Sequence, residues 1–137
     1  MKKTIFVARL IEEVVGSPKE HVEATLKNVI EQLKKEEGVK VLKEENYEAE
    51  LLKNGLWSAF AEIEYETASF KRMLEICFDY MPSTFEIIEP AGLEIDTNDI
   101  ASLFNDLLAK LHKYALAIKT LQAENLLLKQ KMQKEKA

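Results

Sequence analysis

The sequence contains few of the residues that form cross-links, sharp turns or metal sites. Cys77 is the only cysteine among 137 residues, so no disulfide can form within the chain, and we expect a reduced, cytoplasmic setting. Three prolines and four glycines leave few breaks, which favours long helices and strands. No stretch approaches the roughly 20 consecutive apolar residues of a membrane span, so we expect no membrane partner.

The residues of common catalytic and metal sites are equally sparse. His21 and His112 are the only histidines, and neither has a cysteine or a second histidine at the spacing of metal ligands. No glycine-rich phosphate loop is present. Cys77 falls on an apolar helical stripe, where a core position is expected rather than a nucleophile. We therefore expect no enzymatic activity, no catalytic residue, no metal and no cofactor.

The N-terminal part of the chain shows strand and helix patterns in turn. Residues 4–10 are rich in β-branched and apolar side chains and predict a central strand. Residues 10–16 fit either a strand or a helix. The run Ser-Pro-Lys-Glu at 17–20 predicts a helix start with Ser17 as the N-cap of a capping box, and Gly38 is expected to end that helix.

The following residues complete a pattern of two helices and four strands. It predicts, in order, a strand over 39–51 with an irregularity near Glu45-Asn46, a hairpin turn at Asn54-Gly55, a strand over 57–66, a helix capped by Thr67 and ended by Pro82, and a strand over 84–89. This order is typical of a ferredoxin-like βαββαβ sandwich, an antiparallel sheet with both helices on one face. We therefore expect an α+β domain over 1–92.

Residues 93–137 are expected to form a linker and a long C-terminal helix. From Thr97 onward the chain has neither glycine nor proline, and apolar residues recur in a heptad. Eight of nine seam positions are apolar, which predicts a coiled coil that joins two chains as a homodimer. The predicted dimerisation residues are Phe104, Leu107, Leu111, Tyr114, Ile118, Leu121, Asn125, Leu128 and Met132.

The polar exception, Asn125, indicates how two chains would pair. Facing amides in a parallel pair can hydrogen-bond, whereas a slipped pair would bury an unpartnered amide at a cost of about 1–3 kcal/mol. In the same heptad Glu124 and Lys129 are placed to pair between parallel chains. An antiparallel pair, or a helix folded back on its own domain, remains an alternative. Four leucines lie off the seam and favour a tetramer, a partner helix or docking on the domain: Leu108, Leu116, Leu126 and Leu127.

Two short segments resemble the motifs of RNA-recognition-motif domains. They are 5–10 and 55–63, and the resemblance implies that Phe6 and Phe60 lie side by side on the open sheet face and stack bases. The distribution of charge argues against nucleic-acid binding by this face. From Thr97 onward the chain has seven lysines and four acidic residues, so the rest of the chain, which contains the sheet, is acidic. The acids expected around this face are Glu48, Glu50, Glu62, Glu64 and Glu86. We therefore expect the binding partner to be a protein rather than a nucleic acid.

A second resemblance covers the middle third of the chain and the start of the long helix. The segments 77–83, 87–90 and 105–112 resemble uncharacterised conserved proteins of archaea, a family that implies a lineage but no activity. Our leading hypothesis is a non-enzymatic, homodimeric interaction protein with an unidentified protein partner. The alternative is a small-molecule sensor similar to ACT-type regulatory domains, with a ligand between subunits near residues 9–17.

Overall fold

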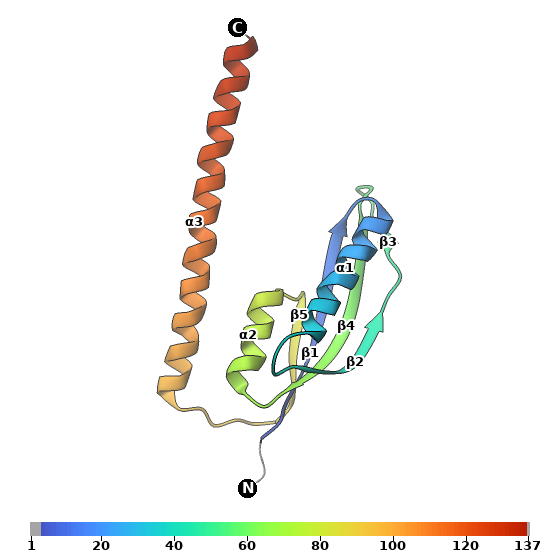
Figure 1. Cartoon of the computed structure of the whole chain (residues 1–137), viewed down its shortest axis with the longest axis vertical. Helices are drawn as coiled ribbons and strands as arrows, with labels where there is room; N and C mark the ends of the chain where they lie inside the picture. Colours follow the sequence, from blue (N-terminus) through green and yellow to red (C-terminus); the bar gives the residue numbers. More distant parts are fainter. Residues whose placement is uncertain (1–3, 137) are drawn as a thin grey trace. The chain divides into compact units, whose positions relative to one another are not determined.

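The computed structural model describes residues 4–136 and contains both helices and strands, as the sequence predicts. In chain order the elements are β1 (Phe6–Gly16), α1 (Lys19–Lys34), β2 (Lys40–Asn46), β3 (Glu50–Leu51), β4 (Trp57–Thr67), α2 (Phe70–Tyr80), β5 (Thr84–Glu89) and α3 (Thr97–Lys136) (Figure 1). The chain divides into two compact units, Met1–Leu93 and Glu94–Ala137, and each is described by itself. The α+β class is confirmed.

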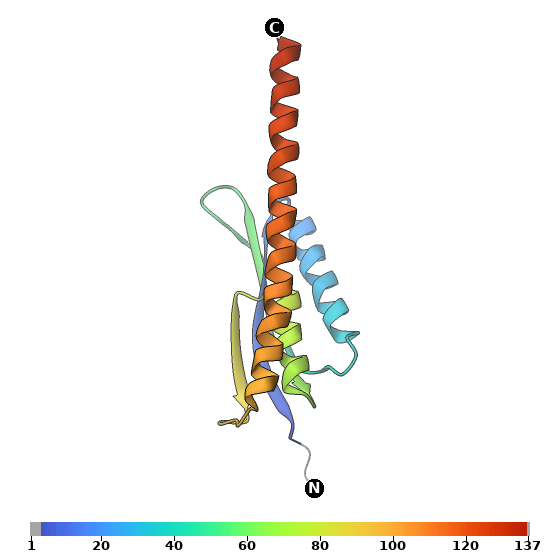
Figure 2. The same ribbon diagram turned by 90° about the vertical axis from the view of Figure 1, so that its left-hand side faces the viewer.

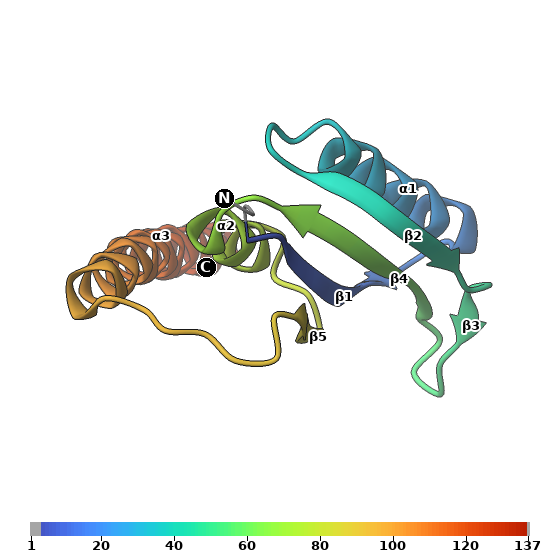
Figure 3. The same ribbon diagram turned by 90° about the horizontal axis from the view of Figure 1, so that it is seen from below.

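The first unit is built on a five-stranded antiparallel sheet with the order β2-β4-β1-β5, in which β3 pairs with the far end of β4. β1 and β4 have 11 residues each and pair along their whole length, from Phe6 opposite Thr67 to Gly16 opposite Trp57. α1 and α2 lie on the same face of the sheet (Figure 3) and bury their apolar stripes against it. The other face of β1 and β4 is open.

β1 is longer than the strand predicted over 4–10, because the ambiguous segment 10–16 also pairs with β4. The regular alternation of β4 offers a partner for every residue of β1, so strand pairing decides what local periodicity leaves undecided. As a result Leu10 and Val14 face the helices, whereas Val15 is exposed on the other face.

Both helix starts differ from the predictions. Pro18, with ψ at 177°, is the N-cap of α1, so the predicted N-cap Ser17 lies one residue too early and no side chain caps this helix. Ser69 rather than Thr67 caps α2, and its hydroxyl accepts a hydrogen bond from the backbone N–H of Arg72 at 3.3 Å. Thr67 is instead the buried last residue of β4.

The core lies between the sheet and the two helices. Val22, Leu26, Ile30 and Leu33 of α1 are buried, and their spacing of three and four residues forms the apolar stripe of this helix. On α2 the most deeply buried residues are Met73 and Ile76, while Cys77 is only half-buried and Met81 is exposed. The core position predicted for Cys77 is therefore occupied by its neighbour Ile76. Tyr65 of β4 is fully buried, and its hydroxyl donates to the carbonyl of Met73 at 2.8 Å.

α3 is one continuous helix of 40 residues (Figure 2). Asp96 precedes it, and its carboxylate accepts a hydrogen bond from the backbone N–H of Asn98 at 2.7 Å. Asp99 lies in the first turn and Lys134 and Lys136 in the last, which suits the partial charges at the two helix ends. The predicted long C-terminal helix is confirmed.

We expect Tyr65→Phe to lower the free energy of unfolding by about 1 kcal/mol, because the buried hydrogen bond to Met73 is lost while the packing of the ring stays. Urea denaturation of the full chain measures this. Tyr47→Phe, which alters a hydroxyl on a partly exposed ring, serves as the control and should change stability by less than about 0.5 kcal/mol. Equal losses in the two variants would contradict a special role for the Tyr65 hydroxyl.

Candidate functional site

The first candidate surface is the apolar seam of α3. All nine predicted dimerisation residues lie within this helix, and their spacing of three and four residues places them along one side. Leu107 is half-buried, and the other large apolar members are exposed: Phe104, Leu111, Tyr114, Ile118, Leu121, Leu128 and Met132. Exposed apolar side chains along one side of so long a helix are typical of a surface that packs against a partner.

The leucines off the seam are exposed to a similar degree. Leu108, Leu116, Leu126 and Leu127 all count among the exposed large apolar residues. Apolar surface on α3 therefore extends beyond the width of a two-stranded seam. Within the described part of the chain, no helix is long and apolar enough to cross a membrane.

The second candidate surface is the open face of the sheet, which is charged rather than aromatic. Arg9 lies at its centre on β1, and its guanidinium contacts Glu64 at 2.8 Å, Glu62 at 3.2 Å and Glu86 at 3.2 Å. The hydrogen bond to Glu64 is the largest cause that raises the pKa of Arg9, and the neighbouring carboxylates add to it. Lys43 and Glu45 of β2 lie opposite Glu64 and Glu62, so two cations among four carboxylates leave this face acidic.

The predicted pairing of Phe6 with Phe60 is wrong. Phe6 is buried in the core beneath the helices, where its ring lies 6.0 Å from that of Phe70. Phe60 lies on the open face and stacks on Tyr47, with ring centroids 4.5 Å apart. Phe60 is opposite Glu13 in the ladder, not opposite Phe6, so the strand register separates the two phenylalanines.

The acids predicted around the open face divide in the same way. Glu62, Glu64 and Glu86 meet at Arg9 as described. Glu48 instead pairs with Lys19 at the start of α1, at 3.4 Å. Glu50 of β3 lies opposite Ser58 in the ladder and so is exposed on the open face, as predicted. The place of Arg9 in this cluster could have been found from the sequence, because strand alternation puts residue 9 on the face opposite Leu10.

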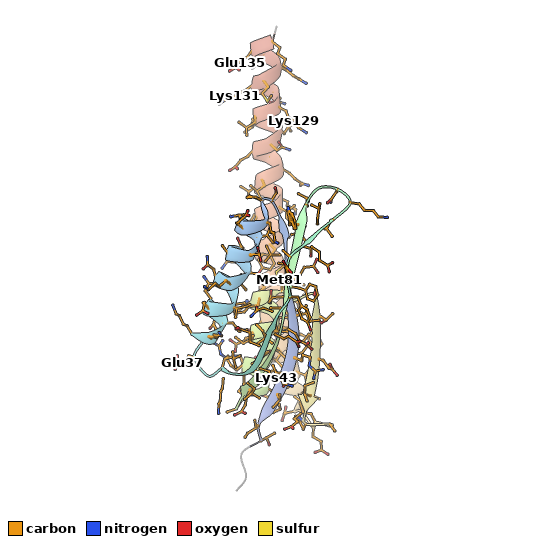
Figure 4. All side chains as sticks on the ribbon, turned by 90° about the vertical axis from the view of Figure 1, so that its right-hand side faces the viewer. Glu37, Lys43, Met81, Lys129, Lys131 and Glu135 are labelled. Atoms are coloured by element: carbon orange, nitrogen blue, oxygen red, sulfur yellow. The ribbon has the colours of Figure 1, made fainter. Side chains whose placement is uncertain are left out.

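A third site lies between α1 and α2, above the far half of β1. A cavity of about 440 Å³ opens there, which we call the helix cleft. Its lining residues are Glu12, Glu13, Val14, Val29, Gln32, Glu36, Asp79, Tyr80 and Met81. Met81, labelled in Figure 4, directly follows α2 and has a left-handed backbone with φ at 45°. Three of these residues, Glu12, Glu36 and Asp79, are acids on the helix side of the sheet, whereas the Glu13 carboxylate accepts a hydrogen bond from the Ser58 hydroxyl on the open face at 3.2 Å. None of the described lining residues is basic.

Glu12 is the unusual residue of the helix cleft. Its side chain is only 5% exposed, and within residues 4–136 its Oε1 atom has no hydrogen-bond partner. Burial raises the pKa of this carboxyl to about 7, because the charged form is poorly solvated. Burial raises the pKa of the Cys77 thiol, and the negative charge of Glu12 raises it further, which lowers the fraction of reactive thiolate.

Glu36, in the turn that follows α1, connects this turn to α2 at the rim of the cleft. Its Oε2 accepts a hydrogen bond from Arg72 at 2.7 Å, and its Oε1 accepts one from the Tyr80 hydroxyl at 2.8 Å. Both carboxylate oxygens of Glu36 are therefore engaged, unlike Oε1 of Glu12. The position of Glu12 could have been found from the sequence, because it has the same strand parity as Leu10 and Val14, but only if 10–16 is read as strand.

Among residues 4–136 no three histidine, cysteine, aspartate or glutamate side chains are grouped closely enough to hold a metal ion. What the structure defines is a class of α+β protein, in which an antiparallel sheet with helices on one face is followed by a long C-terminal helix.

The chain belongs to the MJ0538 family, whose model matches residues 7–136. The match takes in both the sheet domain and α3, so the two units occur together in the family's pattern. The predicted membership of an uncharacterised family is confirmed, and it carries no activity over to this chain. No curated protein sequence matches it.

The pH dependence of stability tests the burial of Glu12. Because folding raises the pKa of this carboxyl, the native state binds more protons than the unfolded chain between the ordinary carboxyl value and about 7. Native stability therefore falls as pH rises through this window, by up to roughly 3 kcal/mol. Urea denaturation at several pH values should show this fall in the wild type.

Two variants isolate the contribution of Glu12. Glu12→Gln removes the titrating group at nearly constant volume and should abolish this component of the pH dependence, so that the variant becomes the more stable protein above about pH 7. Glu50→Gln removes an exposed carboxylate and should retain the wild-type profile. A Glu12→Gln profile parallel to that of the wild type would show that Glu12 titrates normally.

Proposed function

We propose that this protein is a non-enzymatic interaction protein of the cytoplasm, of archaeal origin, that α3 joins into a parallel homodimer. The observation that carries the proposal is the continuous seam of exposed apolar residues along α3. Left in water, these side chains would forgo about 1.5–3 kcal/mol each of the stabilisation that burial provides. A second copy of the same helix offers a complementary seam of the same length.

The polar residues of the helix support a parallel pair. Asn125 lies at an a position, where two facing amides satisfy each other only if the chains are parallel and in register. Glu124 and Lys129 occupy the g and e positions that come together between parallel chains. Pairing of this kind selects orientation, while the apolar seam supplies most of the free energy.

A dimer of this kind presents two copies of the sheet domain. We assign that domain to the ferredoxin-like arrangement, which is supported by the order β2-β4-β1-β5, the antiparallel pairings and the placement of α1 and α2 on one face. Its open face suits a basic protein partner, because three carboxylates surround Arg9. The same charges repel phosphate, and with Phe6 in the core only Phe60 of the two aromatic residues is available to stack on a base.

A pair of adjacent leucines provides a matched test of dimerisation. Leu128 lies on the seam and Leu127 off it, yet their exposures on the helix are 59% and 60%. We expect Leu128→Glu to weaken self-association roughly 100-fold, because two carboxylates would be buried against each other. Leu127→Glu should leave the dimer intact. Sedimentation equilibrium of both full-length variants measures the difference.

Two outcomes would contradict the proposal. A wild-type chain that sediments as a monomer at micromolar concentration has no dimer to disrupt. Equal weakening by Leu127→Glu and Leu128→Glu would show that the contact does not follow the heptad seam. A chain ending near Asp96 should be monomeric, which assigns self-association to α3.

The role of Asn125 is tested separately. We expect Asn125→Ile to raise the thermal midpoint of unfolding, because an apolar residue at an a position packs better than an amide. The same change should broaden the range of oligomers, since nothing then penalises other registers. Thermal scans and sedimentation velocity measure the two effects, and an unchanged result in both would place Asn125 off the seam.

A further inference from the structure

A buried carboxyl group in the lining of the helix cleft has an oxygen atom without a hydrogen-bond partner among the described residues. The Glu12 carboxyl is withdrawn from solvent, but its Oε1 receives no hydrogen bond from the described residues. A buried acceptor without a donor costs about 1–3 kcal/mol, and more when it is charged. A ligand that donates a hydrogen bond to this oxygen would remove that cost.

The charge of the lining indicates the sign of that ligand. The cleft is lined by acidic, apolar and neutral polar residues and by no lysine, arginine or histidine. Arg72, which contacts the lining residue Glu36, is paired with it at 2.7 Å. Because none of the described lining residues is basic, a positively charged partner for an ionised Glu12 would have to come from a ligand.

The number of available oxygen atoms separates an organic cation from a metal ion. Calcium takes six to eight oxygen ligands, and magnesium needs near-octahedral coordination. Both oxygens of Glu36 are engaged, and no group of three acidic, histidine or cysteine side chains forms a cation cage within residues 4–136. An ammonium group needs only about three acceptors. The carboxylate of Glu12 and the side-chain carbonyl of Gln32, which both line the cleft, would supply some of them.

The walls of the cleft suit an alkyl chain behind that ammonium. Val14, Val29 and Met81 contribute apolar surface from β1, α1 and the end of α2. The hydrogen bond from the Tyr80 hydroxyl to Glu36 ties α2 to the turn that follows α1. We propose that the helix cleft binds a small primary aliphatic amine, whose ammonium group pairs with Glu12 and whose chain packs on Val29 and Met81.

The proposal is tested with n-butylammonium chloride added to the full-length protein at about pH 8. Two-dimensional NMR should show saturable shifts of backbone amides near Glu12 and Met81, beyond those caused by sodium chloride at the same concentration. Glu12→Gln should reduce the affinity at least tenfold, because it removes the charge. Glu50→Gln, which removes an exposed carboxylate outside the cleft, should bind like the wild type.

The pH response provides a readout that needs no variant. The titratable groups that line the cleft or couple to Glu12 are Glu13 on β1, Glu36 in the turn after α1, and Cys77, Asp79 and Tyr80 on α2. With the pKa of Glu12 at about 7, affinity should be about tenfold lower at pH 6 than at pH 8. Saturating butylammonium should also lower the apparent pKa of the Glu12 carboxyl, followed by carbon NMR.

Three results would overturn the proposal: shifts that do not saturate or that sodium chloride reproduces, equal affinity in Glu12→Gln and the wild type, or a Glu12 pKa that the amine leaves unchanged. These measurements are made on the cleft of one chain. They are therefore independent of the sedimentation experiments, and either proposal can fail while the other stands.

Discussion

The full-length antiparallel ladder between β1 and β4 is the contact to which every other element of the sheet domain is attached. β2 and β3 pair with β4, β5 pairs with β1, and α1 and α2 pack on the face that these two strands share. Because side chains alternate along both strands, this single ladder sorts the residues into an apolar layer under the helices and a charged layer around Arg9.

The same alternation accounts for the feature that sets the helix cleft apart. β1 continues past Leu10 with strand geometry, so Glu12 has to face the helix layer although its side chain is ionisable. Beside it lies the helix cleft, a recess open to solvent that is lined by residues of β1, α1 and the end of α2. A buried carboxyl destabilises the fold more than an apolar residue at the same position would. A binding role for Glu12 would account for this cost.

The sequence was a good guide wherever one pattern repeated over many residues, as in α3, in the buried stripe of α1 and in the alternation of β4. It failed where a partner decides. The length of β1 depends on β4, and the burial of Glu12 and the separation of Phe6 from Phe60 follow from that pairing. Local signals at helix starts were misleading by a residue or two, since Pro18 and Ser69 occupy the cap positions.

The charged residues of β1 also protect its alignment. If β1 slipped by one residue along β4, Arg9 would enter the apolar layer and Leu10 would lie among Glu62, Glu64 and Glu86. Such a misfolded sheet would bury a guanidinium while three carboxylates lost their counter-ion. Arg9 therefore excludes competing alignments during folding, a role that it would fulfil even if no partner ever met the open face.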